Sequence, residues 1–243
     1  MKGAGMSHFD LIAFDADDTL WENEHLYLAG QAGLVELLAQ YHPPEWVNER
    51  LYQTEMRNLE HFGYGIKAFA LSMIETAVEL TEGRVSGRDL QTLIDMAKDM
   101  LHAKVELIDH VSETLDHLKT GHALMLLTKG DLFEQENKVA RSGLRDCFRY
   151  IEIVSKKNSS VYRGLLEKHS IRPERFLMAG NSLRSDILPV LELGAYAVYI
   201  PHALTWQHEN ADLPPAGEPG YYQLENLGQL PALLKRLEDL CNQ

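Results

Sequence analysis

Three aspartates stand directly behind a short apolar run near the start of the chain. Asp15, Asp17 and Asp18 follow residues 11–14, which read LIAF. Two carboxylates about 4 Å apart repel each other by a few kcal/mol at an effective dielectric constant near 20, and a divalent cation or a lysine would relieve that repulsion. Alternate residues of a loop that leaves a strand can face one site. We therefore expect Asp15 and Asp17 to work as a pair, and Asp18 to be a turn residue that bonds nearby amides.

A threonine ends a second apolar run farther along the chain. Thr128 closes the segment LMLLT and is followed by Lys129 and Gly130. A hydroxyl group and backbone amides at a predicted helix N-terminus are suited to binding phosphate oxygens. We predict that Thr128, Lys129 and Gly130 bind phosphate. The side chain of Lys129 either adds positive charge near the phosphate or is solvated.

Two later segments carry a lysine and two oxygen-bearing side chains. Lys157 offers a positive charge to the phosphate, with its neighbour Lys156 as the competing candidate. Asn181 and Asp186 offer the oxygen ligands that a hard cation such as Mg²⁺ prefers. Lys157 thus offers a positive charge near the aspartate pair, and Asn181 and Asp186 offer oxygen ligands for a metal cation.

Together these residues suit phosphoryl transfer. Asp15 attacks phosphorus and becomes an aspartyl-phosphate, and Asp17 protonates the leaving alkoxide and then deprotonates the water that cleaves the intermediate. Lys157 and Mg²⁺ offset the negative charge of the phosphoryl oxygens. The predicted catalytic residues are Asp15, Asp17, Thr128 and Lys157, and the predicted metal ligands are Asp15, Asp17, Asn181 and Asp186.

Hydrophobic patterning places these residues at the ends of strands. Short apolar or alternating runs predict strands, and segments with helical spacing between them predict helices. The strands are expected at 9–17 (running into a loop), 122–128, 150–154, 175–180 and 195–201, and the helices at 109–120, 131–142, 159–169, 186–193 and 228–240. This alternation indicates a doubly wound parallel α/β sheet, in which ligands bind beyond the carboxyl ends of the strands. Pro, Gly and acidic residues predict a surface loop at 209–223.

A long helical block interrupts the alternation after the first strand. Apolar side chains repeat at helical spacing there, as at Ile66, Phe69 and Met73, and the block is too long for an ordinary loop. We predict an inserted all-helical cap domain at 21–106 and a core domain made of 1–20 and 107–243.

Composition restricts the class of protein. The 243 residues carry a formal net charge of −13, from 23 basic and 36 acidic residues, which disfavours nucleic acid and anionic membranes as partners. The two cysteines cannot form a disulfide framework. With no signal-peptide pattern and no apolar run near the ~18 residues of a membrane span, we expect a cytoplasmic protein, as a monomer or homodimer.

Four motifs in order resemble those of the haloacid dehalogenase (HAD) superfamily. The first, DxDx[TV], matches 15–19; Thr128 matches the second; Lys157 in VSKKN matches the third; GNSLRSD, 180–186, matches the fourth in part. The resemblance implies a HAD-like Rossmannoid core with a helical cap of the C1 type. Asn181 departs from the pattern, since most members have an aspartate there as a direct Mg²⁺ ligand. An amide oxygen can coordinate, but it carries no charge.

The resemblance implies an enzyme and leaves several activities open. A phosphatase for a small phosphate ester fits best, because Asp17 supplies the acid/base group, and a nucleotide is one candidate substrate. The family's 2-haloacid dehalogenases lack that second aspartate and work without Mg²⁺. Its phosphomutases share the aspartate and a helical cap. The remaining alternative is a non-catalytic phosphate-binding protein, whose metal site Asn181 would weaken.

Several further residues are candidates for substrate contacts or for the edge of the site. His61, Tyr64 and Lys67 surround a predicted helix break and are candidates for substrate contact. Trp21, Glu22 and Asn23 are expected to form a flap, with Trp21 equally suited to a core position. Arg184 is placed either in a salt bridge or at the mouth of the site.

Overall fold

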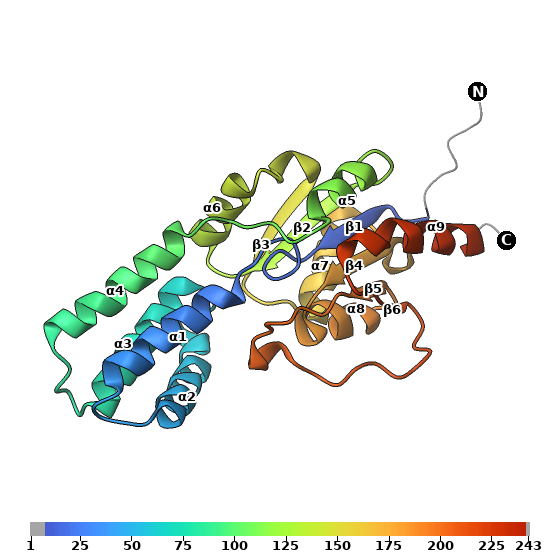
Figure 1. Cartoon of the computed structure of the whole chain (residues 1–243). Helices are drawn as coiled ribbons and strands as arrows, with labels where there is room; N and C mark the ends of the chain where they lie inside the picture. Colours follow the sequence, from blue (N-terminus) through green and yellow to red (C-terminus); the bar gives the residue numbers. More distant parts are fainter. Residues whose placement is uncertain (1–7, 242–243) are drawn as a thin grey trace. The chain divides into compact units, whose positions relative to one another are not determined.

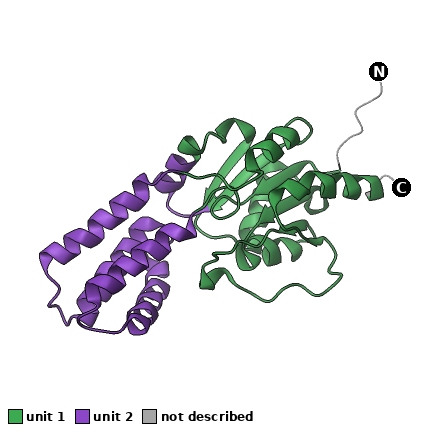
Figure 2. Ribbon diagram, in the orientation of Figure 1, with its two compact units in different colours: residues 1–22, 105–128, 139–243 green, residues 23–104, 129–138 purple. Residues whose placement is uncertain are grey.

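The computed structural model describes residues 8–241 (Figure 1). The chain forms two compact units (Figure 2). One, the sheet unit, contains residues up to 22, 105–128 and 139 onward. The other, the helical unit, contains residues 23–104 and 129–138.

A six-stranded sheet with the order β3-β2-β1-β4-β5-β6 forms the centre of the sheet unit. Its strands are Leu11–Phe14 (β1), Leu124–Lys129 (β2), Tyr150–Val154 (β3), Phe176–Gly180 (β4), Tyr196–Tyr199 (β5) and Tyr221–Gln223 (β6). Strand β1 pairs in parallel with β2 and β4, and β5 pairs in parallel with β4 and β6. The predicted parallel α/β sheet is confirmed.

Helices cover both faces of this sheet because alternate strand residues point to opposite sides. In β1, Ile12 and Phe14 join one apolar core, whereas Leu11 and Ala13 join another. The first core also takes side chains of α5 and α9, and the second takes side chains of α7 and α8. These helices span Val111–Leu118 (α5), Leu230–Cys241 (α9), Ser159–His169 (α7) and Leu188–Leu191 (α8). Short 3₁₀ turns lie at Arg145–Cys147, Pro173–Arg175, Gln207–Glu209 and Leu227–Gln229.

Two sequence predictions about this unit hold only in part. The segment 209–223 does not end as a loop, because its last three residues form the edge strand β6. Three residues are too few to show an alternating pattern. The helix predicted at 186–193 begins earlier than expected, with a π-helical turn at Leu183–Ile187 that leads into α8 within the predicted range. The turn begins earlier because Ser182, not Asp186, caps it: the Ser182 side chain accepts a hydrogen bond from the amide of Ser185.

The helical unit is built from four long helices. They span Glu24–Leu38 (α1), Pro44–Phe62 (α2), Ile66–Leu80 (α3) and Gly87–His102 (α4). Their apolar faces meet in a core of their own, which includes Leu34, Leu51, Met73 and Leu93. A capping box between Ser86 and Asp89 starts α4. Helices therefore form in the block where the sequence predicted them. Among residues 8–241, no helix is long and apolar enough to cross a lipid bilayer.

The helical unit also includes residues 129–138, the start of α6 (Leu132–Ser142). The buried carboxylate of Glu134 accepts a hydrogen bond from the amide of Ile66 at 2.8 Å. Lys138 is also buried. Its Nζ lies 3.2 Å from Oε1 of Glu134 and donates a hydrogen bond to the side-chain oxygen of Asn23 at 2.7 Å. Buried charged contacts thus tie the start of α6 to the helices before it in the sequence.

Candidate active site

The sheet register brings three predicted site residues to one edge. Phe14 at the end of β1 lies opposite Leu126 of β2 and Ala179 of β4. Asp15, Thr128 and Asn181 each follow within two residues of these positions. The amide of Asp15 continues the ladder by donating to the carbonyl of Ala179 at 2.9 Å. The carboxyl ends of three adjacent strands therefore carry the predicted nucleophile, phosphate-binding hydroxyl and metal ligand.

Lys157 lies between two carboxylates at this edge. Its ammonium nitrogen is 2.5 Å from Asp15 Oδ1 and 2.7 Å from Asp186 Oδ1. Its side chain is 1% exposed, whereas the neighbouring Lys156 is exposed. The structure thus brings Lys157 to the aspartates and leaves Lys156 at the surface. Sequence alone could not separate two adjacent lysines.

One ammonium group does not balance the carboxylates around it. Burial raises the pKa of Asp15 to about 7; Lys157 lowers it, and the charges of Asp186 and Asp17 raise it further. Burial by itself would lower the pKa of Lys157, but the charges of Asp15 and Asp186 hold this pKa above its usual value. The cluster therefore keeps the lysine charged and carries an excess of negative charge that a cation would relieve.

Thr19 connects Asp15 to Asn181, a contact that sequence analysis did not foresee. Its hydroxyl lies 3.2 Å from both Asp15 Oδ2 and Asn181 Oδ1, and it accepts a hydrogen bond from the Asn181 amide at 3.1 Å. One hydroxyl proton is shared between these two acceptors. The Asn181 side-chain oxygen therefore lies beside the nucleophile candidate. The signal was present, since Thr19 is the last residue of DxDx[TV].

Asp17 is held by a tryptophan four residues later. Trp21 Nε1 donates to Asp17 Oδ1 at 2.7 Å, and the Trp21 ring is buried in the core of the sheet unit. Trp21 therefore takes the core position that the sequence allowed for it. Asp18 has a positive φ of 60° and its amide donates to the carbonyl of Trp21, so it is the expected turn residue.

Asp186 reaches the cluster because of a glycine at the end of β4. A side-chain carbon on Gly180 would overlap the carboxyl group of Asp186, so only glycine leaves room for it. Asp186 Oδ2 accepts a hydrogen bond from the Ser182 amide at 3.1 Å. Asp186 is thereby fixed with one oxygen on Lys157 and the other on its own loop. The guanidinium of Arg184 donates a hydrogen bond to the carbonyl of His208 at 3.1 Å. Its place in a salt bridge or at the mouth of the site stays a prediction.

The remaining predicted residues belong to the helical unit. The ammonium of Lys129 lies 4.6 Å from the ring centroid of Tyr64, a cation–π contact. Lys67 forms an ion pair with Asp131 at 2.8 Å. Gly130 has a φ of +144°, which disfavours any side chain. That Lys129 and Gly130 bind phosphate, and that His61, Tyr64 and Lys67 contact substrate, stay predictions.

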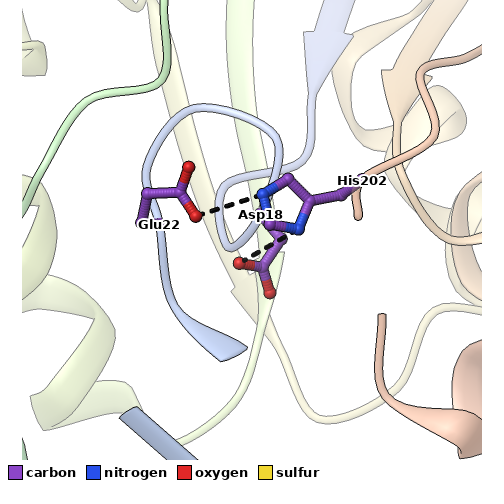
Figure 3. A group of neighbouring side chains, drawn as sticks. All are labelled: Asp18, Glu22 and His202. Carbon is purple, nitrogen blue, oxygen red and sulfur yellow. Dashed lines mark ion pairs between the residues drawn. The ribbon is translucent and has the colours of Figure 1, made fainter. Parts of the chain in front are cut away.

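A second group of titratable side chains lies in the sheet unit, outside the predicted ligand set. The His202 ring stands between two carboxylates, with Nε2 3.1 Å from Glu22 and Nδ1 3.8 Å from Asp18 (Figure 3). Nδ1 also lies 2.8 Å from the carbonyl oxygen of Leu204. The His202 ring thus links the turn after β1 to the segment after β5.

The chemistry of the predicted ligand set fits Mg²⁺. Asp15, Asp17, Asn181 and Asp186 offer only oxygen donors, which hard cations prefer. Burial, together with the charges of Asp186 and Asp17, keeps the pKa of Asp15 raised to about 7 despite Lys157, so a bound cation would stabilise the ionised form of Asp15. The set has one charge fewer than four carboxylates would give, because Asn181 is neutral.

Comparisons with a family model and with solved structures point to the same family. The model of the haloacid dehalogenase-like hydrolase family matches residues 9–194. Among solved structures, a haloacid dehalogenase-like family hydrolase from Xanthomonas campestris is 38% identical, with a TM-score of 0.87 over 98% of this chain and 96% of that one. A 2-haloacid dehalogenase from Pseudomonas syringae, 21% identical with a TM-score of 0.63 over 94% and 99% of the chains, shares the fold.

Two curated relatives are phosphatases. An N-acylneuraminate-9-phosphatase from Mus musculus is 24% identical over 96% of this chain and 97% of its own. A glyceraldehyde 3-phosphate phosphatase from Methanothermobacter thermautotrophicus is 23% identical over 80% of this chain and 86% of its own. Both names refer to small phosphorylated substrates.

Proposed function

The chain belongs to the haloacid dehalogenase-like hydrolase family, as its four motifs predicted, and we propose that it is a Mg²⁺-dependent phosphatase acting on a small phosphorylated metabolite. One observation carries the proposal: Asp15 is buried against Lys157, and Asp17 follows two residues later with its carboxylate held by Trp21. The first carboxylate supplies a nucleophile and the second an acid/base group. The relatives named as phosphatases support this reading.

The reaction proceeds in two displacements at phosphorus. An Asp15 oxygen forms a bond to phosphorus while the bond to the ester oxygen breaks, and protonated Asp17 gives its proton to the departing alkoxide. Asp17, now a carboxylate, takes a proton from water as the water oxygen attacks the phosphorus of the aspartyl-phosphate. The phosphorus–Asp15 bond breaks, which releases phosphate and restores the Asp15 carboxylate. The proton taken from water leaves Asp17 ready for the next cycle.

The other residues balance charge during these steps. Lys157 donates hydrogen bonds to Asp15 and Asp186 and offsets charge at the phosphoryl group, and the hydroxyl of Thr128 binds a phosphoryl oxygen. Asp15, Asp17, Asn181 and Asp186 would hold Mg²⁺, which supplies positive charge that stabilises the phosphoryl oxygens and lowers the pKa of Asp15. A carboxylate with a pKa near 7 is half protonated at neutral pH, so this lowering favours the nucleophile.

The helical unit is proposed to act as the cap that selects the substrate. The helix break at 63–65 carries Tyr64, whose ring contacts Lys129, the residue after Thr128 in the sequence. Acylneuraminate 9-phosphates, glyceraldehyde 3-phosphate and nucleoside monophosphates are the candidate substrates. Cytoplasmic location and a monomeric or dimeric state are part of the same proposal.

Phosphate release tests the proposal directly. The purified chain should release inorganic phosphate from an aryl phosphate and from at least one of the candidate substrates only when Mg²⁺ is added. Asp15→Asn should abolish this release, and turnover that survives in that variant would remove Asp15 from the nucleophile role. Conversion of chloroacetate without Mg²⁺, with no phosphate release, would favour dehalogenation instead.

A further inference from the structure

We propose that Glu209 is a positioning residue for the candidate metal-binding loop 181–186, and that it places behind the neutral Asn181 a negative charge that the loop lacks. The inference rests on the proposed function, since it concerns the same site. Glu209 lies in the 3₁₀ turn Gln207–Glu209, beyond β5 and far in sequence from the four motifs. Its segment shows no pattern that would reveal such a role from the sequence.

The Glu209 carboxylate accepts two hydrogen bonds from the loop. Oε2 takes the hydroxyl of Ser182 at 2.5 Å and that of Ser185 at 2.6 Å. Glu209 is only 9% exposed, and both serines are buried. A buried carboxylate with two short hydroxyl contacts is a strong acceptor, because charged hydrogen bonds are shorter and stronger than neutral ones.

These two serines are the residues that fix Asp186. The Ser182 amide donates to Asp186 Oδ2 at 3.1 Å, and the Ser182 carbonyl accepts from the Asp186 amide at 2.9 Å. The Ser182 hydroxyl also accepts from the Ser185 amide at 2.9 Å, and the Ser185 carbonyl accepts from the Tyr162 hydroxyl at 3.0 Å. Displacing either serine would therefore displace the carboxylate that binds Lys157.

The position of Glu209 also matters for charge. Ser182, which it binds, follows directly after Asn181, the member of the predicted ligand set that carries no charge. Burial is the main cause that raises the pKa of Tyr162, and the charges of Asp186, Asp15 and Glu209 raise it further, so the charge of Glu209 acts on a neighbour that Asp186 and Asp15 also act on. A carboxylate behind an amide ligand raises the negative potential at a cation site without occupying a coordination position.

The test compares Glu209→Gln with wild type and with Glu192→Gln. Glutamine keeps the shape of the side chain but removes the charge and one acceptor. Glu192 is the matched control, because its carboxylate also accepts a serine hydroxyl, that of Ser159, in the sheet unit. Hydrogen exchange of the amides of Ser182, Ser185 and Asp186 reports loop order without metal, and calorimetry with MgCl₂ reports metal affinity. Melting temperature is recorded for every variant.

Glu209→Gln should speed exchange at these three amides and weaken Mg²⁺ binding by about tenfold, the lower end of the range for outer contacts of metal ligands. Glu192→Gln should change neither. Asn181→Asp in the Glu209→Gln background should restore most of the lost Mg²⁺ affinity, because it returns the missing charge to the site. A merely structural residue would lower the melting temperature without this rescue.

Three results would overturn the inference. Unchanged exchange at the three amides in Glu209→Gln would show that Glu209 does not position the loop. An unchanged Mg²⁺ affinity in that variant, or a double variant no better than Glu209→Gln alone, would remove the charge role. If wild type itself binds no Mg²⁺, the proposed function and the charge role fail together, and the exchange result still decides the positioning role.

Discussion

Replacing Lys157 by glutamine should destabilise the sheet unit strongly and in a pH-dependent way. Its ammonium contacts Asp15 and Asp186 at 2.5 and 2.7 Å with almost no solvent exposure. Coulomb's law at an effective dielectric constant near 20 gives about 6 kcal/mol for each contact. The cost of burying the ammonium offsets several kcal/mol of this, and breaking a buried ion pair typically costs about 3–5 kcal/mol. We expect a loss of that size in the free energy of unfolding at about pH 8.

The loss should shrink at lower pH. Without Lys157, the carboxyl group of Asp15 loses the positive charge that lowers its pKa, so it titrates above about 7 in the folded variant. A carboxyl group whose pKa is raised by folding contributes stability that is present at low pH and lost as pH rises through the folded value. Near pH 5, roughly two units below that value, Asp15 is protonated and no longer repels Asp186.

Urea-induced unfolding at the two pH values measures this difference, with Lys156→Gln as the control. That control removes the same charge one residue away, from an exposed side chain, and should change stability by no more than about 0.5 kcal/mol. Equal losses in the two variants, or a Lys157→Gln loss that does not depend on pH, would refute the reasoning.

Three other substitutions give separate tests. Asp17→Asn should still bind phosphate in calorimetry but lose about 100-fold or more in kcat; an unchanged kcat would exclude Asp17 as the acid/base. Asn181→Asp adds a charged oxygen and should lower the Mg²⁺ concentration needed for half-maximal activity, whereas an unchanged metal titration would show that Asn181 is no ligand. Burial raises the pKa of Glu55 from 4.5 to about 7, so its contribution to stability is present below 4.5 and lost as pH rises through 7. Above pH 7, Glu55→Gln should therefore increase the free energy of unfolding by up to about 3 kcal/mol and raise the melting temperature, whereas at about pH 4 it should change neither. A change that is the same at both pH values would contradict this.

Much of the sheet unit could be predicted because its strands are buried and parallel. Continuous apolar runs followed by polar residues identify both the strand and the ligand-facing end, as at Phe14 and Asp15. This is why the residues that meet Lys157 were found without a structure. The same reasoning identifies no strand as short as β6, since three residues have no measurable period.

Contacts between segments far apart in the sequence could not be predicted in the same way. The choice of Lys157 over Lys156 depends on which side chain turns inward, and the two residues are adjacent. Glu209 meets Ser182 only because the chain after β5 returns to the loop after β4. No local pattern encodes such a return, so tertiary packing alone assigns these residues.

The inclusion of residues 129–138 in the helical unit has a consequence for protein engineering. A graft that replaces only 23–104 with the helices of a relative would remove Ile66 and Asn23, the partners of Glu134 and Lys138. Two buried charged side chains would then meet foreign surfaces, and an uncompensated buried charge is among the costliest errors in a redesigned fold. A working chimaera must exchange two pieces of chain together, and the second of them begins immediately after Thr128.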